Sequence, residues 1–340
     1  MTTGFYSARR ADEMGRWLGH VERLRLLRRI FVSGLPWSGY ANLLGFSMRR
    51  FLLGRKIPVS VMIALTYRCQ CDCAHCAITS LRRADLEEMP TATVMRIMED
   101  ARRLGAVKVG FTGGEPLLRG DIARLVRHAY DHGLSNAIDT NGLLLDRGMA
   151  RELKQAGVTN VNVSVDHADA RHHDRLRRLP GCQAAAWRAV EHCAAAGIPC
   201  VVSTYVTDRS LAGGGLAELI RLAKSAGASA VRVLFPVYSG RLRGRRPLLS
   251  RANQSLFFNS IVDASYVYSE SPFYDFLSGR MECAMLKKLS IYVTAYGDVK
   301  YCYASRGSLG SVRTAGLREI LEGRRYFDPG PADAADCQAC

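Results

Sequence analysis

Residues 59–76 read VSVMIALTYRCQCDCAHC, an apolar run followed at once by a loop that holds four cysteines. Three of them, Cys69, Cys73 and Cys76, have the spacing C-x3-C-x2-C. A 4Fe-4S cluster needs thiolates that converge from one short loop, and three protein ligands leave one of its irons open to bind another molecule. We therefore predict a strand that ends in a three-cysteine iron–sulfur loop, with Cys71 outside the ligand set.

A disulfide framework and a zinc site are the alternatives for these cysteines. Disulfide frameworks are typical of short secreted chains, and this chain of 340 residues begins without a secretory signal pattern. Zinc takes paired C-x2-C knuckles. Cys73 and Cys76 have that spacing, as have Cys337 and Cys340. Such a zinc site leaves Cys69 without a role, so we favour the cluster.

The composition predicts a globular protein. Apolar residues make up 48% of the chain, which suffices for one large domain and a smaller one. No apolar stretch reaches the roughly 18 residues of a membrane span. We expect a cytoplasmic location with reduced thiols.

The net charge of +16 is concentrated at one end, because residues 1–56 hold eleven Lys or Arg and three acidic residues. Apolar side chains recur there with helical spacing, which predicts an amphipathic helix. This helix would pack on the main domain, or would contact an anionic membrane surface or an acidic substrate. Nucleic-acid binding is not expected, because no recognition module accompanies the charge. The apolar positions are Met14, Trp17, Leu18, Val21, Leu24, Leu27 and Phe31.

Short β-branched runs alternate with helical stretches from residue 59 onward, which is typical of a parallel sheet in an α/β fold. The predicted strands are 59–65, 107–112, 135–139, 161–165, 199–206 and 231–235, and the predicted helices are 93–104, 122–132, 147–156, 183–196 and 215–226. Six such units predict a partial (β/α)6 TIM-like barrel, whose site lies at the carboxyl ends of the strands.

Four regions follow from this pattern. We predict a basic helical N-terminal extension (1–56), the partial barrel (57–236), a connecting helical segment (237–281) with a helix over 253–268, and a small α+β C-terminal module (282–340). A basic run from Arg241 to Arg246 lies in the connection, on the expected substrate side.

The sequence Gly113-Gly114-Glu115-Pro116 follows the second predicted strand. Coming after the cysteine loop, it makes the chain resemble the radical S-adenosylmethionine (AdoMet) superfamily. The resemblance implies that the cluster's open iron binds the amine and carboxylate of AdoMet. It also implies reductive cleavage to a 5′-deoxyadenosyl radical, which abstracts a hydrogen from the substrate. The cofactor supplies this chemistry, and the protein supplies position and electrostatics.

The same resemblance implies an AdoMet site at the strand ends. Gly113 and Gly114 would let the backbone approach the ligand, and Glu115 would offer a carboxylate to its ammonium. Ser164 would contact the ribose, and Arg177, or else Arg178, the carboxylate. Asn141 and Asp166 are also predicted to contact AdoMet, although ordinary turn chemistry explains them as well. His75 and Val206 are predicted to lie near the adenine of AdoMet.

The C-terminal module has the pattern Cys283-x13-Gly297-x4-Cys302 and then Cys337-x2-Cys340, with an apolar run at 291–293 and a Gly297-Asp298 turn that predict a hairpin. It resembles the SPASM/twitch extension of radical AdoMet enzymes. The resemblance implies a second, auxiliary 4Fe-4S cluster on these four cysteines, with zinc as the alternative. A cluster with four protein thiolates is suited to passing electrons.

Several remaining side chains have two interpretations. Cys182 is a candidate thiol that returns a hydrogen atom to a substrate radical, and is otherwise a loop residue. Cys193 and Cys200 are expected in the core. Tyr205, Tyr238 and Tyr303 are substrate-side candidates or packing residues.

The motifs leave the substrate open, because fold and cofactor do not determine the reaction. We expect oxidation (dehydrogenation) or epimerisation of a small natural-product intermediate such as a sugar or aminocyclitol. The alternatives are a maturase of ribosomally made peptides, a membrane-surface enzyme with a lipid-linked substrate, and a zinc scaffold without catalysis. The basic surface predicts an acidic electron donor such as flavodoxin or ferredoxin.

Overall fold

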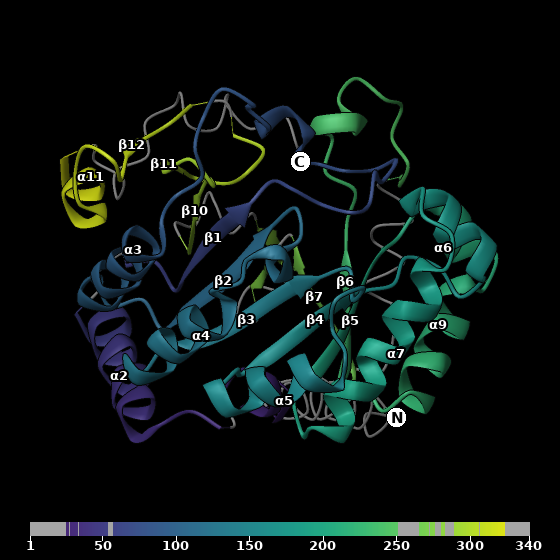
Figure 1. Ribbon diagram of the computed structural model, residues 1–340, viewed down its shortest axis with the longest axis horizontal. Coiled ribbons are helices and arrows are strands. Elements are labelled where there is room, and N and C mark those ends of the chain that lie inside the picture. Colours follow the sequence, from purple (N-terminus) through teal and green to yellow (C-terminus); the bar gives the residue numbers. More distant parts are fainter. Residues whose placement is uncertain are drawn as a thin grey trace, which may run out of the picture.

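Six parallel strands form the centre of the computed structural model (Figure 1). The structure describes residues 25–26, 28–32, 34–53, 57–250, 265–271, 273–275, 280–282, 289–305 and 307–323. The central strands are β1 (Ser60–Thr66), β2 (Lys108–Gly113), β3 (Ser135–Thr140), β4 (Asn160–Ser164), β5 (Cys200–Tyr205) and β6 (Ala230–Leu234). Each of the six predicted strands is confirmed, with ends displaced by one residue at most.

Helices connect these strands and cover the outside of the sheet (Figure 1). In α3, Val94, Ile97, Met98 and Ala101 are buried, so the apolar stripe at i, i+3, i+4 and i+7 packs on the strands. α3 ends at Gly105, whose φ of 98° is the left-handed conformation that glycine adopts readily. The connecting helices are α3 (Thr91–Leu104), α4 (Ile122–Asp131), α5 (Arg147–Ala156), α6 (Ala170–Arg177), α7 (Cys182–Ala195), α8 (Asp208–Ala212) and α9 (Gly215–Ser225).

The sheet is wider than the six predicted strands, and it is not a closed barrel. Its order is β12-β11-β10-β1-β2-β3-β4-β5-β6-β7. β7 (Val267–Ser271) pairs parallel with β6, and β10 (Ser290–Val293) pairs parallel with β1. The predicted hairpin is confirmed, because β11 (Asp298–Lys300) is antiparallel to β10; β12 (Gly310–Ser311) follows. The outer elements are β8 (Phe273–Asp275), β9 (Arg280–Glu282), α11 (Leu317–Gly323) and the short helices η2 (Thr79–Leu81), η3 (Pro116–Leu118) and η4 (Gly240–Leu242).

The predicted helix over 253–268 is wrong at its end. Val267 and Tyr268 lie in strand β7, and the amide of Val231 in β6 donates to the carbonyl of Tyr266 at 2.9 Å. β-branched and aromatic residues favour strands, and the free edge of β6 supplies the partner. Residues 253–264 of this prediction lie outside the described residues.

The described part of the N-terminal region packs on the main domain. Leu26 and Ile30 contact Val201 and Ala230, which lie in β5 and β6. The predicted apolar positions 14–24 and 27 lie outside the described residues. α2 (Trp37–Ser47) and the π-helix η1 (Met48–Leu52) follow, and the buried side chain of Asn42 donates to the carbonyl of Ala106 at 2.9 Å.

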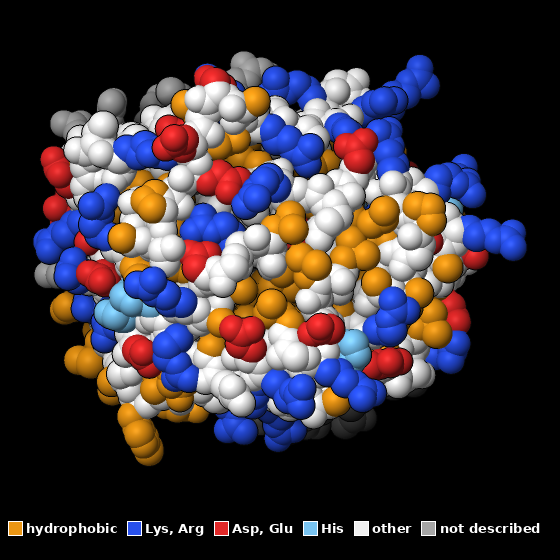
Figure 2. All heavy atoms as spheres, in the orientation of Figure 1, with side chains coloured by type: hydrophobic (Ala, Val, Ile, Leu, Met, Phe, Trp, Pro, Cys, Tyr) orange, Lys and Arg blue, Asp and Glu red, His pale blue; other side chains and the backbone are white. Residues whose placement is uncertain are grey.

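α2 and η1 also leave apolar side chains in solvent. Trp37 is 89% exposed, Leu44 65% and Leu52 76%. Figure 2 shows hydrophobic side chains protruding at the lower left, over the position of α2 in Figure 1. Among the described residues, none of the helices has the length and apolar character that crossing a membrane requires.

Candidate functional site

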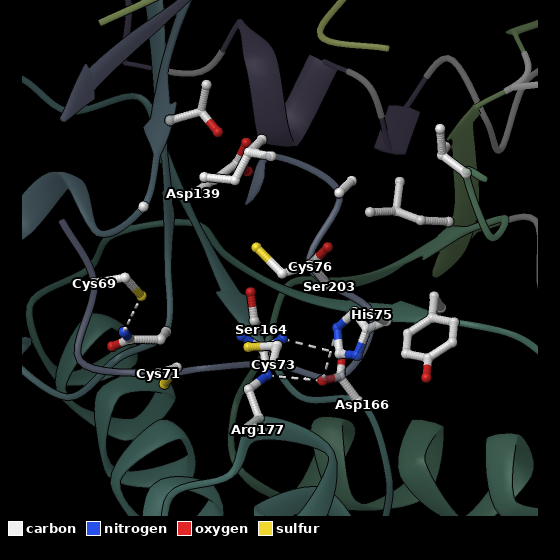
Figure 3. A pocket seen from close by; sticks show the side chains of 18 of the residues that line it. Cys69, Cys71, Cys73, His75, Cys76, Asp139, Ser164, Asp166, Arg177 and Ser203 are labelled. Atoms are coloured by element: carbon white, nitrogen blue, oxygen red, sulfur yellow. Dashed lines mark hydrogen bonds and ion pairs between the residues drawn. The ribbon is translucent and has the colours of Figure 1, made fainter. Parts of the chain in front are cut away.

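The carboxyl ends of the six central strands surround a cavity of about 290 Å³. The cysteine loop after β1 forms one wall, and Figure 3 shows the sulfurs of Cys69, Cys73 and Cys76 pointing toward a common space. The other walls come from the ends of the remaining strands, which contribute Thr112, Thr140, Ser164, Tyr205 and Leu234. The three thiols of the motif therefore converge on one cavity.

Backbone contacts from distant segments hold the cysteine loop in place. The amides of Asp72 and Ala74 donate to the carbonyls of Arg177 and Leu176 at 3.2 and 2.8 Å. Arg241 donates through its backbone amide to the carbonyl of Cys76 at 3.1 Å and through Nη1 to that of Cys73 at 3.0 Å. The first residue of the predicted basic run thus supports the cluster loop.

Cys71 prepares its neighbours to bind iron. Hydrogen bonding from the Cys71 thiol lowers the pKa of Cys69 to about 6, against the effect of burial, and also lowers the pKa of Cys73. The sulfur of Cys71 itself lies 3.8 Å from that of Cys182. Thiolates are the form that ligates metals, so the two neighbours have the chemistry of cluster ligands.

The two glycines of the Gly113-Gly114 turn lie directly against the cysteine loop. The amide of Gly114 donates to the carbonyl of Thr66 at 2.7 Å, and the amide of Glu115 donates to that of Arg68 at 2.9 Å. A Cβ atom at Gly113 would lie 2.2 Å from the carbonyl oxygen of Thr66, and φ is +125° there. Only glycine allows this approach, so the motif joins the ends of β1 and β2.

Glu115 has a different position from the one the sequence predicts. Its side chain is fully buried and does not line the cavity. Oε1 accepts from the Thr140 hydroxyl at 2.8 Å and the Leu117 amide at 3.1 Å, and Oε2 accepts from the Asn141 amide at 2.8 Å. Burial raises the pKa of Glu115 to about 7, against these three donors. The carboxylate therefore fastens β2 to the end of β3 and does not face a ligand ammonium.

Asn141 connects this turn to the cysteine loop. Its Nδ2 donates to Gln70 Oε1 at 3.1 Å and lies 3.8 Å from the sulfur of Cys69. Asn141 lines the cavity, as do Gly113, Gly114 and Ser164. These predicted site residues are brought together by the structure.

A buried ion pair lies on the α6 side of the cavity. Arg177 Nε and Nη2 donate to the two carboxylate oxygens of Asp166 at 2.7 and 3.1 Å. Burial alone would raise the pKa of Asp166, but the charges of Arg177 and His75 outweigh it and hold the pKa below its usual range. His75 Nε2 lies 3.5 Å from Asp166, and the His75 ring stacks on Tyr205 with centroids 4.5 Å apart.

We expect Arg177→Met to lower the free energy of unfolding by about 3–5 kcal/mol, because it leaves the buried Asp166 carboxylate without its partner. Arg178→Met is the matched control, since Arg178 pairs with Asp72 at the surface and such pairs contribute about 1 kcal/mol or less. Urea unfolding of cluster-loaded protein under anaerobic conditions measures both. Equal losses for the two variants would contradict this account of the pair.

Three further predicted positions lie away from the cavity lining. Arg178 points to the surface and pairs with Asp72 at 2.9 Å, whereas Arg177 lines the cavity. Val206 is fully buried in the core, and the cavity wall at this strand end is Tyr205 instead. Cys182 is fully buried at the start of α7, behind Cys71, so it is not placed to return a hydrogen atom to a substrate in the cavity.

Other predicted side chains are also placed. Cys193 and Cys200 are fully buried in the core. The Tyr238 hydroxyl accepts from the Leu248 amide at 2.7 Å, outside the cavity lining. Tyr303 lines the cavity.

The floor of the cavity holds charged residues that sequence reasoning missed. Arg232 Nη2 donates to Asp139 Oδ1 at 2.7 Å, and its Nε donates to the hydroxyl of Ser203 at 3.1 Å. All three line the cavity, from β3, β5 and β6. A charge inside an otherwise apolar strand, as in Val-Arg232-Val and Ile-Asp139-Thr, was the available signal.

The C-terminal module reaches the same cavity. Cys302 precedes Tyr303 of the lining, and it follows β11 of the hairpin that pairs with β1. The other predicted ligands, Cys283, Cys337 and Cys340, lie outside the described residues.

The donors present fit a cluster with a polar ligand beside it. Three thiols converge, two of them with lowered pKa. In the described part of the chain, the buried Nδ1 of His75 in the cavity wall has no hydrogen-bond partner. A buried polar atom of this kind needs a partner, and a bound ligand can supply it.

Comparisons with known proteins agree with this geometry. Residues 63–231 match the model of the radical SAM superfamily, and residues 283–340 match that of the SPASM iron-sulfur cluster-binding domain. The AdoMet-dependent heme synthase of Methanosarcina barkeri is 33% identical over 54% of this chain and 52% of its own length. A PqqA peptide cyclase of Xanthomonas oryzae pv. oryzae is 29% identical over 77% of this chain and 72% of its own.

Among solved structures, Streptococcus suis SuiB bound to the precursor peptide SuiA has a TM-score of 0.64, with 15% identity, over 87% of this chain and 73% of that one.

The chain belongs to the radical SAM superfamily and carries a C-terminal SPASM module. It is therefore an enzyme whose cofactors are a 4Fe-4S cluster and AdoMet, and its SPASM module binds iron–sulfur. It spans about half the length of several curated relatives that it matches.

Proposed function

We propose that this enzyme oxidatively modifies a peptide, removing two hydrogens to form a crosslink or an unsaturated residue. The observation that carries the proposal is that the cysteine loop and a residue of the C-terminal module line one cavity. The thiols of Cys69, Cys73 and Cys76 face it, and Tyr303, next to Cys302, lines it as well. A substrate held there has a site for hydrogen abstraction on one side and a site for electron removal near the other.

The choice of a peptide is supported by the relatives. Similarity to the Xanthomonas PqqA peptide cyclase extends over 77% of the chain, beyond the 54% shared with the heme synthase. The earlier expectation of a sugar or aminocyclitol substrate is therefore second to the peptide alternative.

The protein's own residues have distinct roles in this proposal. Cys69, Cys73 and Cys76 hold the AdoMet-binding cluster, and Cys283, Cys302, Cys337 and Cys340 hold an auxiliary one. When bound, the cluster and AdoMet would together supply the one-electron chemistry that removes a hydrogen atom from the substrate. Gly113 and Gly114 offer backbone to AdoMet, and Asn141 positions the turn against the cysteine loop.

The polar walls would orient both ligands. Ser164 and Arg177 would line the AdoMet side, and His75 would offer its Nδ1, which has no hydrogen-bond partner among the residues that the structure describes. The Asp139–Arg232 pair on the floor offers both a carboxylate and a guanidinium to a peptide backbone or side chain. The side chains of Arg177 and Arg232 are buried, and charges interact more strongly in such surroundings than in water.

We expect a pool of synthetic random-sequence peptides to raise 5′-deoxyadenosine formation by reduced, cluster-loaded enzyme above the rate without substrate. Mass spectrometry should find peptides that have lost two hydrogens. A pool of aminosugars and aminocyclitols serves as the comparison, and Arg232→Met should lose the stimulation while retaining AdoMet binding. Stimulation by the sugar pool alone would overturn the peptide proposal.

The electron donor and a membrane surface are the two partners that remain predictions. The electron donor is expected to be an acidic protein such as flavodoxin or ferredoxin, because the chain has a net charge of +16. Contact with a membrane surface agrees with the exposed Trp37, Leu44 and Leu52, which have Arg49 and Arg50 beside them in sequence.

A further inference from the structure

Two histidines and a glutamate lie together on the outer surface, where α3 packs against α4. His128 is in α4, His132 is one turn further at its end, and Glu99 is in α3. One ligand atom from each lies within 4.8 Å of those of the other two. Figure 2 shows histidine side chains at the left, over the region of α3 and α4 in Figure 1, among basic and acidic side chains.

Both histidine rings bond the backbone. His132 Nδ1 lies 2.8 Å from the carbonyl of His128, and because a carbonyl only accepts, this nitrogen carries the proton. The ring of His128 bonds the backbone of Met95, and its Nε2 is buried without a hydrogen-bond partner within the described part of the chain. A backbone bond at Nδ1 leaves Nε2 as a lone-pair donor, which is the arrangement that metal-binding histidines show.

The distances fit a small tetrahedral ion. Zinc bonds nitrogen and oxygen at about 2.0–2.1 Å, so tetrahedral ligand atoms lie about 3.3 Å apart. His128 Nε2 is 3.5 Å from Glu99 Oε1, and the two imidazole rings lie with centroids 4.1 Å apart. One ring nitrogen of His132 lies within 4.8 Å of the ligand atoms of the other two residues, so zinc would have to draw this ring closer.

Three arginines lie near the site and each contacts another group, one of them Glu99 itself. Arg103 Nη2 lies 3.5 Å from Glu99 Oε2, the oxygen that does not face His128. Arg102 donates to the carbonyl of His132, so its charge is directed at backbone. Arg127 pairs with Asp131 at 3.7 Å on the next turn of α4.

We propose that Glu99, His128 and His132 bind a zinc ion that cross-links α3 to α4. The pattern His-x3-His on one helix, with a carboxylate from a neighbouring helix, supplies three ligands and leaves the fourth position to water. The site lies on the outer face of the two helices and shares no residue with the cavity lining. Its expected role is to stabilise the first and second β–α units, because a ligand that binds only the folded state stabilises it by mass action.

The test titrates zinc into cluster-loaded, full-length enzyme under anaerobic conditions, in competition with a chromophoric chelator. Wild type should bind one zinc per chain more than His132→Gln or Glu99→Gln, with affinity reduced about 10-fold or more in each variant. The thermal midpoint should rise by about 5 °C with zinc at a hundredfold excess over Kd in wild type, and should not rise in His132→Gln or Glu99→Gln.

His172→Gln is the matched control. His172 stacks on His167 with centroids 4.3 Å apart, and that pair belongs to no group of metal-ligating side chains among the described residues. The control should bind zinc as wild type does. The proposal would be overturned if His132→Gln and Glu99→Gln took up as much zinc as wild type. It would also be overturned if zinc uptake were matched by loss of iron from the clusters.

Discussion

Replacing Cys69, Cys73 and Cys76 together by alanine should reduce 5′-deoxyadenosine formation from AdoMet to background and remove about four irons per chain. The reason is that the sulfurs of these three thiols point toward a common space in the cavity. The pKa is lowered for Cys69 and Cys73, whereas burial raises that of Cys76. Iron, sulfide and nucleoside are measured on anaerobically reconstituted protein with dithionite. Wild type should hold about eight irons in two clusters.

Two variants make this result specific. Cys193→Ala removes a fully buried thiol of the core and should keep both the irons and the nucleoside formation. Cys302→Ala should lose about four irons of the auxiliary cluster and retain AdoMet cleavage in the absence of substrate. Zinc in place of iron in wild type, or full activity of the triple variant, would contradict the assignment of the cysteines.

The second large effect is expected at Gly114. In Gly114→Ala the new Cβ would lie 2.2 Å from the carbonyl oxygen of Arg68 and 2.9 Å from the carbonyl carbon of Tyr67. These are backbone atoms of the segment that leads into the cysteine loop, and they cannot rotate away. Overpacking of this kind costs about 1–3 kcal/mol or more. We therefore expect AdoMet affinity to fall at least about 10-fold.

Gly120→Ala is the control for Gly114→Ala. Gly120 follows the same motif, and a Cβ there meets no atom within 4 Å. It should bind AdoMet as wild type does, in equilibrium dialysis of cluster-loaded protein. Wild-type affinity in Gly114→Ala would show that the turn moves away from the loop without effect on the site.

Local sequence patterns predicted most of the elements, because a parallel strand covered on both faces is a short, uniformly apolar run. β1 shows this, with Val61, Ile63 and Leu65 fully buried and Ala64 as well on the opposite face. β7 was missed because its strand character depends on the open edge of β6. A partner that is distant in sequence decides such a strand.

The direction of a buried polar side chain could not be read from its motif. Glu115 was expected to face the ligand, but three donors around its carboxylate turn it into the protein. Val206 was expected at the ligand, but it lies in the core, and its neighbour Tyr205 lines the cavity. Neighbouring residues on a strand point to opposite sides of the sheet, so an error of one residue in the prediction reverses the side.

The sequence by itself determined the cluster loop, the glycine turn and the alternation of strands and helices, because each depends on residues close together in the chain. Only the tertiary structure decided which residues from distant parts of the chain meet around the cavity. Arg232 and Asp139 are 93 positions apart, and Arg241 reaches Cys73 across 168. Such contacts depend on the register and curvature of the whole sheet, which place strand ends side by side whatever their separation in sequence.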